Sequence, residues 1–139
     1  VDQSSHHKHS AYLIRNGGLL GYDPAQVDLI AQIARYHRKS LPKASHAEYA
    51  ALPPPEQRLV SQVAAVLRVA DGLDRSHAQS AHILDLEHSL DLQRGLDLKR
   101  GARGLTLKVT GVHALELEGV RLKGDLWEGM FGPLRVEAG

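Results

Sequence analysis

The first 80 residues place apolar side chains three and four positions apart, which is the spacing of one helix face. This pattern predicts a first helix over residues 5–16, ended by a pair of glycines. A second helix is expected to begin at Asp23, whose side chain can cap the free amides, with Pro24 at the first helical position and Gln26 completing a capping box. This helix should end before Pro42.

A longer apolar pattern follows a connection rich in proline. We expect a short helical turn at 46–51 and then the longest helix of the chain, over 55–77. The stripe expected to face the core consists of Leu59, Val63, Val66, Ala70 and Leu73, with Val60, Ala64 and Leu67 beside it. The N-terminal part of the chain is therefore predicted to be helical.

The period changes after about residue 80, where apolar and polar residues alternate as they do in half-buried strands. The alternating apolar positions are Leu84, Leu86, Leu90, Leu92, Leu96, Leu98, Leu105, Leu107 and Val109. Arg94-Gly95 and Arg100-Gly101 are expected turn sites. The carboxylates between these apolar positions are expected to point outward into solvent, and they are Asp85, Glu87, Asp91 and Asp97.

Residues 113–131 return to a helical spacing, although the first leucines of this segment would also suit a strand. We favour a helix there, followed by a short edge strand at 134–136. The chain is thus predicted to be an α+β protein with a helical part over 1–80 and a small tail over 81–139. We expect three or four strands and one helix in that tail.

Composition limits the classes of partner. The 139 residues include 17 Lys and Arg against 16 Asp and Glu, a formal charge of +1, so a nucleic acid is not an expected partner and any anion site must be local. The chain has no cysteine, which excludes disulfides and thiolate metal sites and fits the cytoplasmic location that we expect. No apolar run approaches the length of a membrane span, and no secretory signal stands at the start.

Three polar residues fall on the apolar faces of predicted helices. His9 shares a face with Tyr12, while His37 and Asp71 each follow apolar residues three or four positions earlier. A buried carboxylate must be paired, hydrogen-bonded or bound to a metal. The three residues can therefore belong to a metal shell or to a hydrogen-bonded polar core.

A basic run provides a second candidate site. Arg35, Arg38 and Lys39 lie near the end of the second helix, with Lys43 just beyond. From the longest helix, Arg68, Arg75 and His77 can join them. Such charges can be a solvated helix end that complements the helix dipole. They can also form a cradle for phosphate, since both Arg and Lys suit its oxygens. No nucleophile with a neighbouring base stands out, so no catalytic residue is assigned to this chain.

Four blocks of sequence, taken in order, resemble one known family. They are His-His-Lys-His-Ser-Ala-Tyr-Leu-Ile-Arg-Asn (6–16), Ala-Arg-Tyr-His-Arg-Lys (34–39), Leu-Arg-Val-Ala-Asp-Gly-Leu-Asp-Arg-Ser (67–76) and Asp-Leu-Trp-Glu-Gly-Met-Phe-Gly (125–132). Their order and spacing are similar to those of the C-terminal domain of exopolyphosphatases and guanosine pentaphosphate phosphatases.

The resemblance implies a helical bundle like that of HD phosphohydrolases, within a parent enzyme that hydrolyses phosphoanhydride bonds of inorganic polyphosphate or guanosine pentaphosphate with Mg²⁺. The chemistry of that family belongs to two N-terminal actin-like domains, which are not in this sequence. The resemblance further implies that the C-terminal domain helps to hold polyphosphate and to form a homodimer. No cofactor is assigned to this chain itself.

The same resemblance places His9, His37 and Asp71 at positions that bind metal in active HD enzymes. The His-Asp doublet that defines those enzymes is absent, so we expect the chain to start after it and any metal site to be vestigial or incomplete. The leading interpretation is a binding and assembly domain. The alternatives are an HD-type metal phosphohydrolase acting on nucleotides or phosphoesters, and a structural fragment that pairs with a second copy.

Overall fold

The computed structural model describes residues 6–90 and 103–139, with the backbone alone described at 6–8, 88–90 and 103. The chain divides into two compact units, Val1–Arg68 and Val69–Gly139. It contains both helices and a small sheet, which confirms the predicted α+β class. The predicted turn sites at 94–95 and 100–101, the strand positions Leu92, Leu96 and Leu98, and the carboxylates Asp91 and Asp97 lie outside the described residues.

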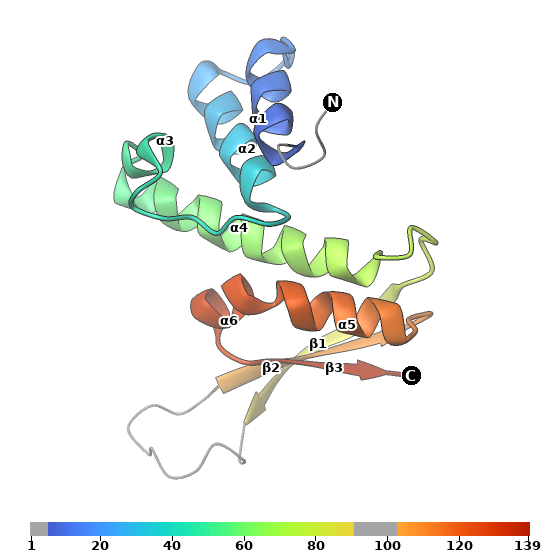
Figure 1. Ribbon diagram of the computed structural model, residues 1–139. Helices are drawn as coiled ribbons and strands as arrows, with labels where there is room; N and C mark the ends of the chain where they lie inside the picture. The colour runs from blue at the N-terminus through green and yellow to red at the C-terminus, as the bar shows by residue number, and fades with distance from the viewer. Residues whose placement is uncertain (1–5, 91–102) are drawn as a thin grey trace. The chain divides into compact units, whose positions relative to one another are not determined.

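The first unit is helical, as its spacing predicted. Helix α1 (His6–Asn16) and helix α2 (Pro24–Tyr36) pack side by side, followed by the short α3 (Ala47–Ala50) and by α4 (Pro54–Leu73), which continues into the second unit (Figure 1). The predicted capping box is present, because the Asp23 side chain accepts from the Gln26 amide at 2.9 Å while the Gln26 side chain accepts from the Asp23 amide at 3.0 Å.

The predicted core stripe of α4 is confirmed only in part, since Leu73 is buried but most of the other residues of the stripe are exposed. Leu59, Val63 and Val66 are each at least 40% exposed, whereas Val60, Ala64 and Ala65 are fully buried. The helix is apolar on more than one side, so periodicity alone could not select the core face. Ser61 and Arg68 also occupy buried positions on α4, and this weakened the pattern on the side that is in fact covered.

The second unit contains a three-stranded sheet in the order β1-β2-β3. Strand β1 (His82–Leu90) is antiparallel to β2 (Arg103–Thr110), and β3 (Leu134–Ala138) is parallel to β2, so that Leu107 pairs with Leu86 on one side and Val136 on the other. This arrangement confirms the edge strand expected near 134–136.

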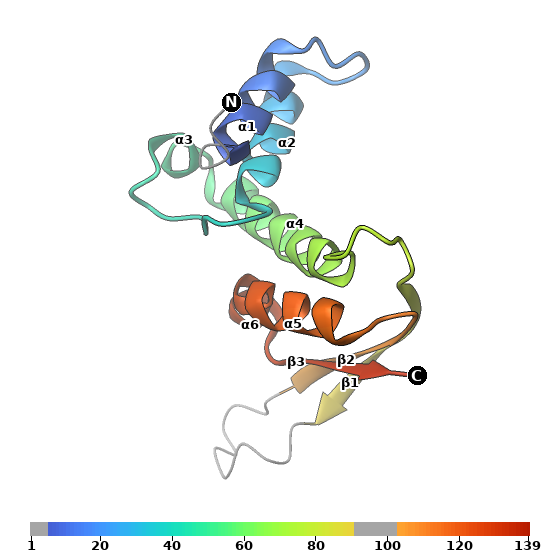
Figure 2. The same cartoon turned by 45° about the vertical axis from the view of Figure 1, so that its right-hand side comes forward.

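Helices α5 (Ala114–Lys123) and α6 (Asp125–Phe131) connect β2 to β3 and lie over one face of the sheet in both ribbon views (Figures 1 and 2). One helix was predicted here, and two are found, because the helical hydrogen bonding is interrupted at Gly124. Val109, Val120 and Trp127 are buried and form part of the core of this unit. None of the described helices is both long and apolar enough to cross a membrane.

Candidate functional site

The basic run continues from the last turn of α2. His37 is the C-cap residue of this helix, and Arg38, Lys39 and Lys43 are exposed beyond it. Arg35 differs from them, since its guanidinium lies 5.4 Å from the centre of the Tyr36 ring and donates to Glu48 Oε2 at 3.2 Å. The exposed residues are thus available to a ligand, whereas Arg35 already has an anionic partner.

Arg68 fixes the backbone that carries this run. Its side chain is almost completely buried, and Nη1 donates to the carbonyl oxygen of Tyr36 at 3.2 Å and to that of Arg38 at 2.8 Å. Carbonyls at the end of a helix have no partner within the helix, so a buried cation is well suited to them. Arg68 therefore holds the backbone at Tyr36 and Arg38, where the basic run begins, although it contributes no exposed charge.

Tyr36 also anchors this helix end, through its ring and its hydroxyl group. Its hydroxyl group hydrogen-bonds to His46 Nδ1 at 2.8 Å, its ring stacks on the His46 ring, and the Tyr49 ring meets it edge-on. Burial raises the pKa of Tyr36 above its ordinary value, because the ionised phenolate would be poorly solvated there. This packing joins the end of α2 to the segment that carries α3.

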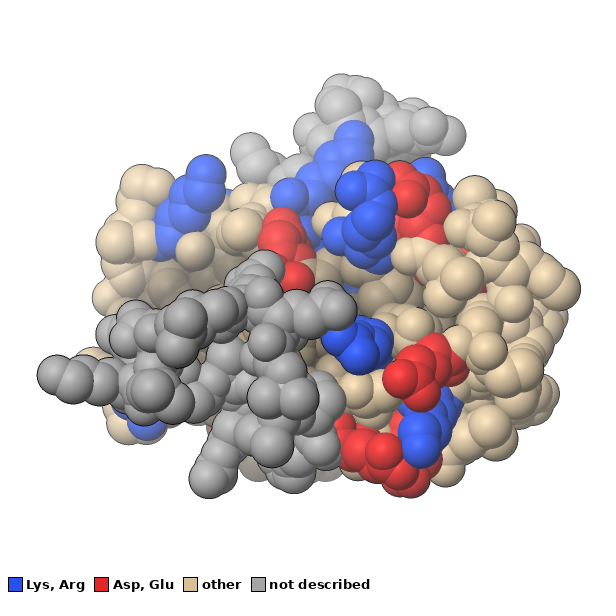
Figure 3. Space-filling view, turned by 90° about the horizontal axis from the view of Figure 1, so that it is seen from below, with Lys and Arg blue, Asp and Glu red and all other residues tan. Residues whose placement is uncertain are grey.

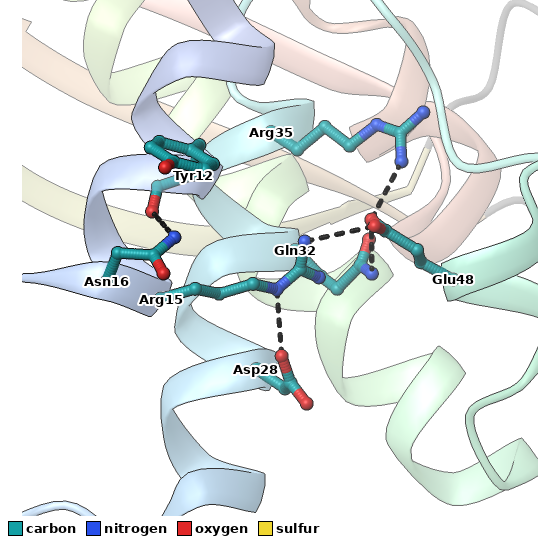
Figure 4. Close-up of polar contacts among 7 residues, drawn as sticks. All are labelled: Tyr12, Arg15, Asn16, Asp28, Gln32, Arg35 and Glu48. Carbon is teal, nitrogen blue, oxygen red and sulfur yellow. Dashed lines mark hydrogen bonds and ion pairs between the residues drawn. The ribbon is translucent and has the colours of Figure 1, made fainter.

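A polar cluster centred on Glu48 links three helices (Figure 4). Arg15, from α1, donates through Nε to Asp28 at 2.8 Å and through Nη1 to Glu48 Oε1 at 3.1 Å. The amide of Gln32 donates to Glu48 Oε2 at 3.4 Å, beside the contact from Arg35. Burial lowers the pKa of Arg15, but the hydrogen bonds to Asp28 and Glu48 outweigh it and raise this pKa above its ordinary value.

The sequence interpretation included Arg35 but missed Arg15, Gln32 and Glu48. Arg15 is the only basic residue in the last turn of α1, and such a charge is usually explained by the helix dipole. Glu48 belongs to a four-residue helix without a periodic pattern of its own. The cluster is therefore a product of the tertiary fold, which brings together residues up to 33 positions apart.

The residues predicted to bind metal lie in different settings. His9 is exposed rather than on a packed face, while His37 is half-buried and its Nδ1 hydrogen-bonds to the carbonyl oxygen of Ala34. Asp71, in the second unit, is half-buried and forms an ion pair with Lys123. An ammonium group beside Asp71 competes with any metal for that carboxylate.

Within the described part of the chain, no three His, Asp or Glu side chains come together in a group that could hold a metal ion. The ion pair of Asp71 also gives this carboxylate the partner that a buried charge requires. These observations do not fit a complete metal centre, and we derive no chemistry through one. The metal assignment of His9, His37 and Asp71 stays a prediction.

Arg75 belongs to the second unit, apart from the basic run of the first. It is exposed. The pKa of Glu118 is lowered mainly by a hydrogen bond from Arg121, and the charge of Arg75 lowers it further.

Asp85 and Glu87 are exposed, as predicted, and Glu87 pairs with Lys108 at 2.8 Å. On the face seen in Figure 3, described basic and acidic side chains are interspersed, so they form no broad field of one sign there.

A family model described as "Ppx/GppA phosphatase, domain III" matches residues 1–113 of the 139. The chain belongs to the Ppx/GppA phosphatase family. This match confirms the predicted resemblance to exopolyphosphatases and pentaphosphate phosphatases, and it covers the basic run and the Glu48 cluster. The fourth resembling block, at 125–132, lies beyond the matched residues. This Ppx/GppA domain III thus presents exposed cations after the end of a helix, and its described residues include no group of three His, Asp or Glu side chains that could hold a metal ion.

Proposed function

We propose that this chain is the phosphate-binding C-terminal domain of an exopolyphosphatase-like phosphohydrolase that acts on inorganic polyphosphate or guanosine pentaphosphate. Hydrolysis would take place in N-terminal actin-like domains, which would also bind Mg²⁺. Family membership supports this assignment, and a cytoplasmic location is part of the same proposal. We further propose that the helices are arranged like those of HD phosphohydrolases.

The observation that carries the binding role is the basic segment held by Arg68. Arg38, Lys39 and Lys43 are exposed, and the start of their segment is fixed by a buried guanidinium, which donates to the carbonyl oxygens of Tyr36 and Arg38. A polyanion gains affinity from each cation that replaces a counterion, and a fixed segment loses less entropy on binding. The segment is therefore suited to a chain of phosphates rather than to a neutral ligand.

Isothermal titration calorimetry at low salt tests this role. We expect the charge-reversal variant Arg38→Glu/Lys39→Glu to lose most of the affinity of the wild type for inorganic polyphosphate. The salt dependence of the remaining binding should also be weaker, because fewer counterions are released. The matched control is Arg58→Glu/Arg135→Glu, which makes the same change in net charge at exposed positions elsewhere. Equal binding by the wild type and the Arg38/Lys39 variant would exclude the proposed site.

We also propose that the chain forms a homodimer. The exposed apolar residues Leu59, Val63 and Val66 follow one another along α4, and a contiguous apolar patch on a soluble protein often marks an interaction surface. Light scattering coupled to size-exclusion chromatography should give twice the monomer mass at micromolar concentration, and Val63→Glu should lower it. A monomer mass at every concentration would exclude the dimer for this chain.

A further inference from the structure

The carboxylate of Glu48 is held from two helices at once. Arg15 donates to one of its oxygens at 3.1 Å, and Arg35 and Gln32 donate to the other at 3.2 and 3.4 Å. Two guanidinium groups and one amide thus converge on a single anionic group, as the dashed lines of Figure 4 show. Forked donors of this kind bind carboxylates and phosphates by the same geometry.

The donors form the base of this cluster, and the acceptor lies nearer to solvent. The side chains of Arg15 and Arg35 are 27% and 17% exposed, whereas that of Glu48 is 52% exposed. Gln32 is buried. An anion that arrives from solvent therefore meets Glu48 first, and it reaches the two arginines when the Glu48 side chain rotates away.

Glu48 does not satisfy all the polar atoms of this cluster. The Nε of Arg35 and the Oε1 of Gln32 are buried and have no hydrogen-bond partner within the described part of the chain. Buried polar groups nearly always have partners, so an unsatisfied donor in a cationic cluster indicates a ligand with more acceptor atoms. A terminal phosphate offers three oxygens and up to two charges, against the two oxygens and one charge of a carboxylate.

The backbone of Glu48 is well anchored. The hydroxyl group of the next residue, Tyr49, donates to the carbonyl oxygen of Gln57 at 3.2 Å and lies 2.9 Å from Ser61 Oγ, and the Tyr49 ring packs edge-on against Tyr36. Release of the arginines thus requires only side-chain rotation at Glu48, while α3 stays in place.

We propose that Arg15, Gln32 and Arg35 form a binding site for a terminal phosphate group, and that Glu48 occupies this site until a phosphate displaces it. The inference rests on the proposed phosphate-binding function and adds a site apart from the exposed run that follows α2. Inorganic polyphosphate and a guanosine polyphosphate share the chemistry of a terminal phosphate. Titrations with tripolyphosphate and with GTP, the two probes, distinguish these sources.

Removal of the competing charge tests the site. Calorimetry with the 139-residue chain should show that Glu48→Gln binds tripolyphosphate about fivefold more tightly than the wild type, since ion pairs of this exposure are worth about that factor. The matched control is Glu118→Gln, which removes one carboxylate paired with an arginine in the other unit. An equal gain in both variants would mean a general charge effect and would overturn the proposal.

A double variant assigns the gain to the cluster. Glu48→Gln/Arg15→Gln should return to wild-type affinity or below, because one of the two released guanidinium groups is gone. Retention of the full gain in this variant would refute the site. Should any variant fail to fold, the Arg Nε–H NMR signals of the wild type provide the test, and those of Arg15 and Arg35 should shift as tripolyphosphate is added. Unchanged signals at saturation would also refute it.

The two proposals fail in different ways. If Arg38→Glu/Lys39→Glu abolishes phosphate binding while Glu48→Gln binds tripolyphosphate no more tightly than Glu118→Gln does, the exposed segment binds phosphate. The site occupied by Glu48 is then wrong. If Glu48→Gln gains affinity for tripolyphosphate but Glu118→Gln does not, and Arg38→Glu/Lys39→Glu has no effect, the binding role of the exposed segment is wrong. The site occupied by Glu48 then stands. If tripolyphosphate binds to none of these proteins, both proposals fail.

Discussion

Gly72 on α4 and Gly119 on α5 bring the backbones of these two helices into direct contact. A Cβ atom at residue 119 would lie 2.5 Å from the carbonyl oxygen of Gly72, and one at residue 72 would lie 2.8 Å from the backbone of Gly119 and Val120. We therefore expect Gly119→Ala to push the helices apart and to lower the free energy of unfolding by about 1–3 kcal/mol. Urea denaturation followed by circular dichroism measures this change.

Gly129→Ala is the control for that substitution. Gly129 lies within α6, and a Cβ atom there would meet no atom within 4 Å beyond its chain neighbours and the backbone of its own helix. Alanine has a higher helix propensity than glycine, so the free energy of unfolding of this variant should be higher by about 0.5–1 kcal/mol. If Gly119→Ala also proves stabilising, the backbones are not in contact and the helix packing described here is incorrect.

Glu116 is a buried carboxylate that should make the stability of the second unit depend on pH in acid. This side chain is 1% exposed, and its carboxylate accepts from the amide of Ser76 at 3.2 Å and from that of His113 at 3.1 Å. A hydrogen bond from the Ser76 side chain is the largest of the effects that lower the pKa of Glu116 from 4.5 to about 2.

A carboxylate whose pKa is depressed by folding stabilises the protein above its unfolded pKa and loses this contribution as the pH falls toward the folded value. Stability should therefore fall between pH 4.5 and 2, and Glu116→Gln should flatten this part of the curve. Urea midpoints measured at several pH values test the expectation. Glu128→Gln removes an exposed carboxylate and should leave the slope unchanged; a slope that is the same in wild type and Glu116→Gln would contradict the assignment.

Arg68 is expected to be among the most sensitive positions of the first unit. Arg68→Met keeps much of the apolar stem but leaves the carbonyl oxygens of Tyr36 and Arg38 without their donor. Buried acceptors without partners are costly, so we expect a loss of about 2–4 kcal/mol in the free energy of unfolding. Arg58→Met, on the exposed side of the same helix, should change it by less than about 0.5 kcal/mol. Similar losses in both variants would exclude a specific role for Arg68.

Tyr36→Phe isolates one hydrogen bond. The variant keeps the buried ring but removes the hydroxyl group that lies 2.8 Å from His46 Nδ1, and we expect a loss of about 1 kcal/mol. Because the pKa of Tyr36 is raised in the folded state, the stabilisation that its neutral form provides should be fully present below the ordinary value of 10. It should be lost as the pH rises above that value. An absorbance titration of the tyrosines should lose its most alkaline component in Tyr36→Phe. Persistence of that component would assign the raised pKa to another tyrosine.

Local patterns in the sequence predicted most of the secondary structure. The capping box at Asp23 and Gln26 was predicted because its interactions join residues three positions apart. The change from helical to alternating spacing near residue 80 placed β1 correctly, since the alternation of apolar and polar residues can be read within a single strand. The division of the last helical segment at Gly124 was missed, because the apolar spacing continues across the break.

The candidate site depends on contacts that no local pattern carries. Glu48 meets Arg15 across 33 positions, and Arg68 reaches Tyr36 across 32, so neither pair shares a helix face that periodicity could reveal. The buried position of Arg68 was also hidden, because a charged residue on a helix is ordinarily assigned to solvent. The exposed cations after α2 were predictable, as they depend only on composition near a helix end.

The hydrogen bonds from Arg68 have a consequence for mutational screens. A screen scored on phosphate capture alone would rank residue 68 with the proposed phosphate ligands, although its side chain is buried and donates to the backbone of the segment that carries them. Suppressors of such a loss should then arise as substitutions that rigidify the chain between Tyr36 and Arg38, and not as added positive charge. Genetic data on this domain would in this way separate the residues proposed to contact phosphate from Arg68, which positions their backbone.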